Sequence, residues 1–202
     1  MGKQKQEKSQ GSNPAKSKQR KPKQGQENPD QRMKLAKTFE LMDVNRSGFV
    51  DASALEAMAE RLAVQAGTSI NAPELREARK SLDQFWRALD ENRNGQLSRD
   101  EYIESMTRLI ADAEQLRKIL DPGNRALFMA FDTDGDGKLS REEYAMMYRD
   151  SGMSESDRRA AFDALDRAGD GYVSIDEFVR ASMDYYLRPD SKHPTSSLMG
   201  GH

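Results

Sequence analysis

Four twelve-residue segments of this chain place oxygen-bearing side chains at spacings that suit a hard cation. They begin at Asp43, Asp90, Asp132 and Asp166. Each carries Asp at position 1, glycine at position 6 and an aliphatic residue at position 8, and most third and fifth positions are Asp, Asn or Ser. Calcium takes six to eight oxygen ligands at about 2.3–2.6 Å, and a loop of this length supplies them from positions 1, 3, 5, 7, 9 and 12. The repeat therefore predicts calcium-binding loops.

The predicted ligands follow from these positions. Residues 43–54, 90–101, 132–143 and 166–177 are called loops 1 to 4. The candidate ligands are Asp90, Asn92, Asn94, the backbone carbonyl of Gln96 and Glu101 in loop 2; Asp132, Asp134, Asp136, the carbonyl of Lys138 and Glu143 in loop 3; and Asp166, Asp170, the carbonyl of Tyr172 and Glu177 in loop 4. Glutamate at position 12 supplies two oxygens, so these three loops are predicted to bind Ca²⁺. Mg²⁺ is the expected competitor.

The loops differ in charge and completeness. Loop 3 offers four carboxylates and is predicted to be the tightest, whereas loop 2 offers only two. In loop 4, Ala168 stands at position 3, where a water would have to replace the side-chain oxygen. In loop 1, Ala54 stands at position 12, so we expect this loop to be a structural partner of loop 2 that binds weakly at best. Repulsion among the clustered carboxylates is expected to raise their pKa values before calcium binds.

Glycine at position 6, an aliphatic residue at position 8 and helical sequence on both sides resemble the EF-hand. The uneven loop spacing of 47, 42 and 34 residues, with RLAVQAG after loop 1 and PDSKHPTSSLMG near the C-terminus, resembles the sarcoplasmic calcium-binding protein and calerythrin family. This resemblance implies two EF-hand pairs around one apolar core, with a C-terminal segment, here containing Leu198 and Met199, folded back over it. The chain departs from that family in its complete loop 2 and in Ala54.

Apolar residues at helical spacing flank the loops and predict an all-α fold with eight principal helices. The later helices are expected at 72–89, 99–120, 124–131, 141–150, 154–165 and 175–187, with a break at Asp121–Gly123 because Pro and Gly end helices. We expect four helix–loop–helix units in two pairs, residues 31–120 and 121–187, packed into one compact body. Residues 1–30 carry eight Lys or Arg against three acids and are expected to form a disordered basic tail, and 188–202 a C-terminal tail.

Composition narrows the function classes. The chain has no cysteine and two histidines, which disfavours zinc and copper and leaves oxygen-ligated cations. No stretch has the length of a membrane span, and the basic tail lacks the aromatic or amphipathic element that would indicate nucleic-acid or lipid binding. No nucleophile–base or phosphate-binding motif indicates an enzyme. We therefore expect a monomeric, cytoplasmic calcium binder.

Two functions remain open at this level. A calcium buffer or calcium-responsive signalling protein would keep its apolar grooves closed, whereas a calmodulin-like sensor opens a Met-rich groove for the helix of a target protein. Eleven methionines suit the sensor, with Met129, Met146, Met147 and Met153 in the C-terminal half, but methionine at helical spacing also fills ordinary cores. The expected return of the C-terminal tail over the core favours the buffer or calcium-responsive protein.

Overall fold

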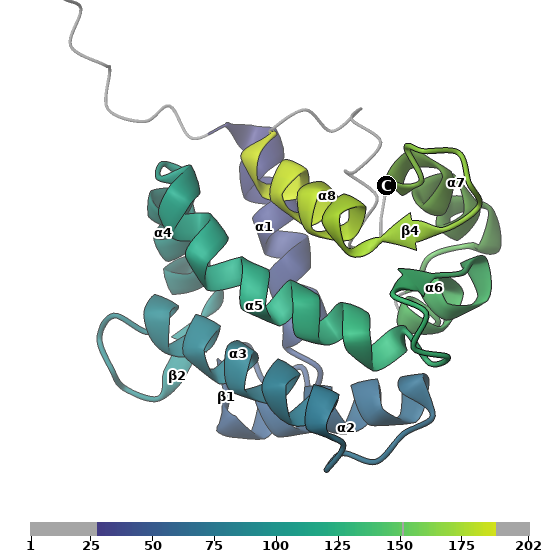
Figure 1. Cartoon of the computed structure of the whole chain (residues 1–202). Helices are drawn as coiled ribbons and strands as arrows, with labels where there is room; N and C mark the ends of the chain where they lie inside the picture. Colours follow the sequence, from purple (N-terminus) through teal and green to yellow (C-terminus); the bar gives the residue numbers. More distant parts are fainter. Residues whose placement is uncertain (1–27, 151, 189–202) are drawn as a thin grey trace, which may run out of the picture.

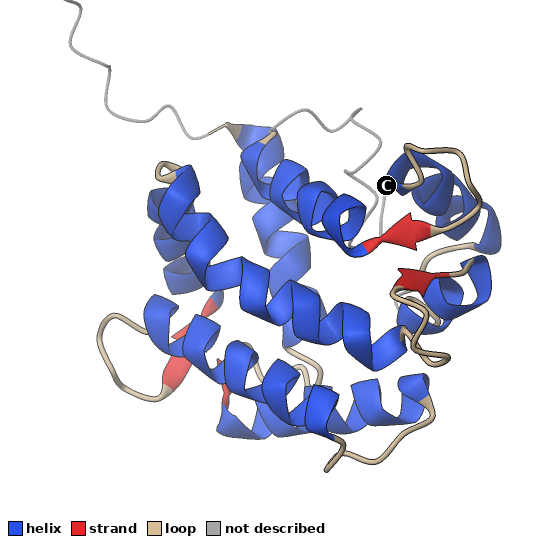
Figure 2. Cartoon of the chain, viewed as in Figure 1, coloured by secondary structure: helices blue, strands red, loops and turns tan. Residues whose placement is uncertain are grey.

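The computed structural model describes residues 28–150 and 152–188. The predicted disorder of residues 1–27 and the predicted return of Leu198 and Met199 over the core lie outside the described residues. Pro29 and Asp30, also assigned to the disordered tail by the prediction, instead form the first turn of a helix that Asn28 caps. The described part contains eight helices and four short strands, with each strand between two helices (Figures 1 and 2). The all-α prediction is confirmed.

Each loop lies between an entering and an exiting helix. The N-terminal half contains α1 (Pro29–Met42), β1 (Phe49–Asp51), α2 (Ala52–Ala66), α3 (Pro73–Leu89), β2 (Gln96–Ser98) and α4 (Arg99–Ile110). The C-terminal half contains α5 (Ala113–Phe131), β3 (Lys138–Leu139), α6 (Arg141–Met147), α7 (Glu155–Leu165), β4 (Val173–Ser174) and α8 (Ile175–Leu187). The first aspartate of every loop is the C-cap of the entering helix, so the loop positions begin where each helix ends.

Short antiparallel strands join the loops in two pairs. Val50 of β1 lies opposite Leu97 of β2, and Leu139 of β3 lies opposite Val173 of β4. All four position-8 side chains are completely buried. The indole N–H of Trp86 also donates to the carbonyl of Val50 at 3.0 Å, which ties loop 1 to the helix that enters loop 2. The backbones of paired loops thus meet at position 8, and loop 1 is structurally joined to loop 2.

The predicted helix break at Asp121–Gly123 is wrong, and the helix expected at 141–150 ends earlier, at Met147. Helix α5 runs through Pro122 and Gly123, and the break lies earlier, where Asp112 caps the new helix with its side chain. Proline inside a helix costs about 3 kcal/mol, so packing must outweigh local preference here. Helix α5 packs along α3 and α8, and a Cβ on Gly123 would stand 3.5 Å from the Cβ of Ser81. The expected division between the two pairs, at residues 120 and 121, therefore falls inside a continuous helix.

The two pairs pack against each other around one apolar core. Within the pairs, α1 contacts α4 and α5 contacts α8; between them, α3 lies along α5 and α2 contacts α6 (Figure 1). The largest fully buried side chains come from both halves and include Tyr102, Phe128, Phe131, Tyr144 and Phe162. None of the described helices combines the length and apolarity needed to cross a membrane. The predicted single compact body is confirmed.

Candidate metal centre

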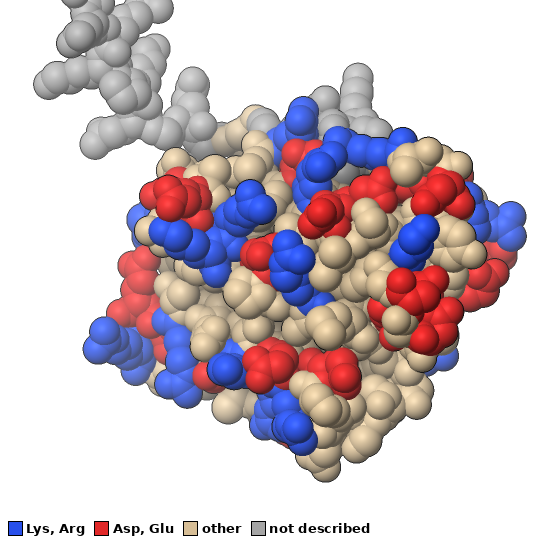
Figure 3. All heavy atoms as spheres, viewed as in Figure 1, with Lys and Arg blue, Asp and Glu red and all other residues tan. Residues whose placement is uncertain are grey.

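Loop 3 gathers its acidic side chains at one point. Carboxylate oxygens of Asp132, Asp134 and Asp136 lie within 4.8 Å of one another. Figure 3 shows acidic side chains gathered at the C-terminal end of α5, where this loop begins. The amide of Gly137 donates to Oδ2 of Asp132 at 2.9 Å, but Oδ1 of Asp132 is buried without a hydrogen-bond partner. A buried carboxylate oxygen without a donor is costly, and a cation is the partner that this geometry lacks.

Glu143, the position-12 residue of loop 3, is buried and held beside the loop. Its Oε1 accepts from the amide and the hydroxyl of Thr133, both at 2.8 Å, and its Oε2 accepts from the amide and the hydroxyl of Ser140, both at 2.9 Å. Burial alone would raise the pKa of Glu143, but these hydrogen bonds outweigh burial and hold the pKa below its ordinary value. The carboxylate is therefore ionised and oriented, as a closing metal ligand must be.

Serine at position 9 explains this placement. Ser98, Ser140 and Ser174 each cap the exiting helix, and the glutamate three residues later reaches back to the cap amide. This reciprocal arrangement is a capping box. The capping box was not predicted, although SRDE, SREE and SIDE carry the Ser-x-x-Glu signal. The glutamate that would close each metal site also fixes the start of the exiting helix.

Loop 2 repeats the arrangement with fewer charges. Asp90 is only 6% exposed; its Oδ2 accepts from the amide of Gly95 at 3.1 Å, and its Oδ1 is buried without a partner, as in loop 3. The side-chain amide of Asn92 donates to Glu101, and Oδ1 of Asn94 accepts from the backbone amide at position 7 at 2.7 Å. The predicted side chains of loop 2 therefore line one loop, with Asn92 brought against Glu101.

In loop 4, the first and last carboxylates accept hydrogen bonds from backbone amides of the loop. Asp166 accepts from three loop amides at 2.7–3.1 Å. Oε1 of Glu177 accepts from the amides of Arg167 and Ala168, at 3.0 and 3.1 Å. The amide of Ala168 is thus engaged, and its methyl group leaves position 3 without a side-chain oxygen.

An ion pair that the sequence did not predict joins loop 3 to loop 4. Lys138, expected to offer only its backbone carbonyl in loop 3, extends its ammonium to Oδ2 of Asp170 in loop 4 at 3.2 Å. The same ammonium lies 5.0 Å from the centroid of the Tyr172 ring. The hydrogen-bonded pair lowers the pKa of Asp170 and raises that of Lys138. A tethered cation therefore already neutralises one candidate ligand of loop 4.

Loop 1 keeps the loop shape without a closing ligand. Asp43 accepts from the amides of Ser47 and Gly48, both at 2.9 Å. Asp51, at position 9, caps α2 by accepting from the amides at positions 11 and 12, and the hydroxyl of Ser53 is the main cause of its lowered pKa. Ala54 is completely buried and offers only a methyl group. One aspartate thus starts helix α2 in place of the Ser-x-x-Glu pair of the other loops.

The expectation that the loop carboxylates have raised pKa values is wrong for Glu143, Asp170 and Glu177. The pKa of each is lowered, for Asp170 by the Lys138 ammonium and for the two glutamates because loop and cap hydrogen bonds outweigh burial. Hydrogen-bond donors in the loops stabilise these ionised carboxylates, whereas the sequence suggested that the carboxylates would repel one another. The position-12 glutamates are preorganised rather than loosened.

These features match a known module. A family model for the EF-hand domain pair matches residues 32–107 and 123–183. The chain belongs to the EF-hand domain-pair family. The prediction of an EF-hand calcium-binding protein is therefore confirmed, and membership of a calcium-binding family agrees with the expectation that the protein is not an enzyme.

Individual relatives of this EF-hand protein are distant. Calcium-binding protein CML19 from Arabidopsis thaliana is 26% identical over 126 residues, which cover 62% of this chain and 66% of the plant protein. The match thus spans just under two thirds of that curated relative. A Streptomyces coelicolor calcium-binding protein has a TM-score of 0.68 at 24% identity, covering 78% of this chain and 98% of the other. An amphioxus sarcoplasmic calcium-binding protein gives 0.68 at 21%, covering 86% and 98%. The two structures show the same fold.

Proposed function

We propose that this EF-hand protein binds Ca²⁺ in loops 2, 3 and 4, with Mg²⁺ as a competitor, and acts as a calcium buffer or calcium-responsive signalling protein. The observation that carries the proposal is the acidic cluster of loop 3. Three aspartates converge within 4.8 Å, and one buried oxygen of Asp132 has no hydrogen-bond partner. Glu143 is held ionised beside them, so a hard divalent cation would complete the charge and the coordination of this loop.

The same reasoning ranks the other loops. Loop 2 has the unpartnered Oδ1 of Asp90 but only two carboxylates, so its attraction for a cation is weaker. Loop 4 lacks an oxygen at position 3, and Lys138 competes with calcium for Asp170. Loop 1 has no position-12 carboxylate, and it contributes by pairing β1 with β2. We expect loop 3 to have the highest affinity.

Packing favours a closed protein over an open sensor. The aromatic side chains that would line an exposed groove, such as Tyr102 and Phe128, are fully buried. Met147 and Met153 are also buried, while Met129 is exposed as a single side chain. Opening a groove would require α3 to separate from α5. The Streptomyces protein is described in connection with calcium-mediated regulation, which supports a calcium-responsive role here as well.

Calcium titration of the demetallated full chain tests the proposal. Calorimetry in physiological Mg²⁺ should resolve three binding events, and the fluorescence of an apolar-surface dye followed in parallel should stay flat. Glu143→Gln is the matched variant, since it keeps the side-chain volume and should remove the tightest event. A rise in dye fluorescence on adding calcium would replace the buffer by a target-binding sensor. An absence of binding to loop 3 would overturn the proposed function.

A further inference from the structure

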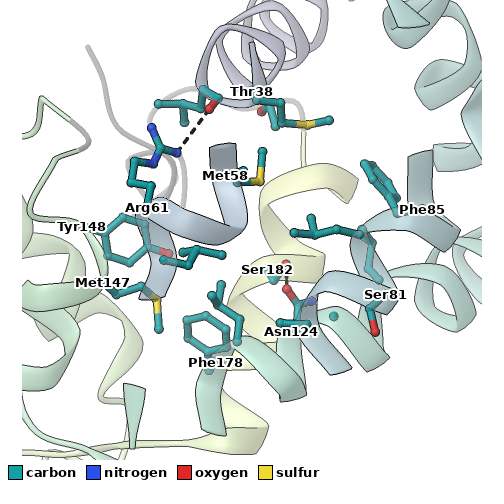
Figure 4. A pocket seen from close by; sticks show the side chains of 18 of the residues that line it. Thr38, Met58, Arg61, Ser81, Phe85, Asn124, Met147, Tyr148, Phe178 and Ser182 are labelled. Atoms are coloured by element: carbon teal, nitrogen blue, oxygen red, sulfur yellow. Dashed lines mark hydrogen bonds between the residues drawn. The ribbon is translucent and has the colours of Figure 1, made fainter. Parts of the chain in front are cut away.

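A cavity of about 220 Å³ lies between the two EF-hand pairs (Figure 4). Its walls come from α1, α2, α3, α5, α6 and α8, and none of its lining residues belongs to loops 1 to 4. A single water needs only ~10–15 Å³, so this partly open space has room for many waters or for a small ligand. This space is therefore far larger than a packing defect and is separate from the candidate metal sites.

The walls of the cavity are mainly hydrocarbon. Side chains from helices of both pairs supply them, among them Met58, Leu62, Leu82, Leu120 and Phe178. Ligand pockets in proteins have this character, with apolar walls and a small number of polar groups that orient the ligand. The cavity thus suits an occupant whose larger part is apolar.

Arg61 supplies a positive charge at the cavity wall. Its Nε is buried without a hydrogen-bond partner, and its Nη2 makes only a long hydrogen bond, 3.4 Å, to the carbonyl of Leu41. The nearby acid Asp150 is already engaged, because it accepts from Gln65 at 3.0 Å and lies 3.8 Å from Arg149. A guanidinium beside apolar walls, with a buried donor unused, is a natural partner for a carboxylate.

A second unused donor lies on another wall. The carbonyl oxygen of Asn124 accepts from the hydroxyl of Ser182 at 3.2 Å, but its Nδ2 is buried without a partner. Figure 4 shows Arg61 and Asn124 on opposite sides of the cavity. Two unsatisfied donors with hydrocarbon between them describe an elongated ligand with an acidic end.

We propose that this cavity binds an amphipathic carboxylic acid of the fatty-acid type, with its carboxylate on Arg61 and its chain among the apolar walls. Asn124 would hold a second oxygen in ligands that carry one. The charge of Arg61 favours an anionic ligand, because a neutral hydrocarbon would leave the buried Nε of Arg61 unpaired. This binding is a property of the protein beyond its calcium sites.

Calorimetric titration of the full chain with dodecanoate, at micromolar concentrations and in parallel with dodecanol, tests the proposal. The acid should bind with one-to-one stoichiometry and about tenfold more tightly than the alcohol, because hydrogen bonds to charged groups are the stronger ones. Arg61→Met should remove this preference, since it keeps the aliphatic stem and loses the charge. Arg117→Met, at an exposed arginine that does not line the cavity, is the matched control and should change nothing.

A second variant separates binding in the cavity from adsorption to the surface. Leu127→Trp fills the cavity from α5 and should abolish binding of both the acid and the alcohol. Circular dichroism and calcium titration of each variant establish that it is folded, and they are independent of the ligand. The proposal is overturned if dodecanoate does not bind saturably, or if it binds equally well to the wild type, Arg61→Met and Leu127→Trp.

Discussion

Loop 1 lacks a closing carboxylate, and restoring it tests the account of all four loops. The double substitution Asp51→Ser and Ala54→Glu would recreate in loop 1 the Ser-x-x-Glu arrangement of Ser140 and Glu143. The rest of the loop is already in place, because Asp43 accepts two backbone amides at 2.9 Å and β1 is paired with β2. We expect the variant to bind a fourth calcium ion.

The expected gain in the calcium affinity of loop 1 follows from the added negative charge and from the cost of ordering the new side chain. A unit charge about 2.4 Å from a divalent ion is attracted by ~3.5 kcal/mol even in a water-like dielectric. Ordering a free glutamate costs up to ~2 kcal/mol, and the capping box removes much of this cost because it fixes the side chain before calcium arrives. A net gain of ~2–3.5 kcal/mol corresponds to a roughly 30- to 300-fold rise in loop-1 affinity. The single substitution Ala54→Glu should gain less, since Asp51 keeps the cap and repels the new carboxylate.

Calorimetry and NMR read the outcome. The double variant should show four binding events instead of three, and the amide resonance of Gly48, which donates to Asp43, should shift during the added event. The matched control combines Asp51→Ser with Ala54→Gln, which has the same shape without the charge and should leave three events. If the folded double variant still binds three ions and the Gly48 resonance does not move, the role assigned to position 12 is wrong.

Three further predictions concern the C-terminal pair. Glu143→Gln should leave two calcium events in a titration, and persistence of the tightest event would contradict the assignment of loop 3. Lys138→Met should raise the loop-4 affinity by a few-fold, because an exposed ion pair with Asp170 opposes the ion only weakly; a fall in affinity would mean that Lys138 supports the loop. Glu143 and Glu177 have folded pKa values below the ordinary 4.5, so the stability they give is complete above that pH and is lost as the pH falls through their folded values. Urea unfolding of the calcium-free protein should therefore show lower stability at pH 4 than at pH 7, with a smaller difference in Glu177→Gln.

Local sequence rules located the helices that flank each loop but not the run of α5. Pro122 and Gly123 are the strongest breakers in that stretch, yet the helix continues through both. The reason is non-local, because α5 packs along both α3 and α8 and lies close to Ser81 at this point. Neither neighbour is adjacent to α5 in sequence, so no pattern within residues 113–131 could have reported that packing. The caps themselves were readable, as Asp112 shows.

The candidate metal sites also contain features that local sequence reveals and features that depend on contacts between distant residues. The loop positions are visible in the sequence, because a twelve-residue loop fixes its candidate ligands by spacing alone. The sequence also shows that Ala54 and Ala168 stand where a ligand is expected. The Ser-x-x-Glu caps were equally visible and were overlooked. The ion pair of Lys138 and Asp170 was not visible, since it joins residues 32 positions apart through the pairing of β3 with β4. Interactions inside a loop can thus be predicted from sequence, whereas interactions between loops need the register of the strands.

Backbone conformation at position 4 separates the two pairs as clearly as ligand charge does. Loops 1 and 2 place Arg46 and Arg93 there, at φ of 55° and 56°, whereas loops 3 and 4 place Gly135 and Gly169, at 72° and 68°. A side chain in this left-handed region costs of order 1 kcal/mol or more, and glycine avoids that cost. Loops 1 and 2 therefore hold this turn against a local strain that loops 3 and 4 avoid. The C-terminal pair combines the unstrained turn with the acidic cluster of loop 3, so it is the half of the molecule better preorganised for calcium.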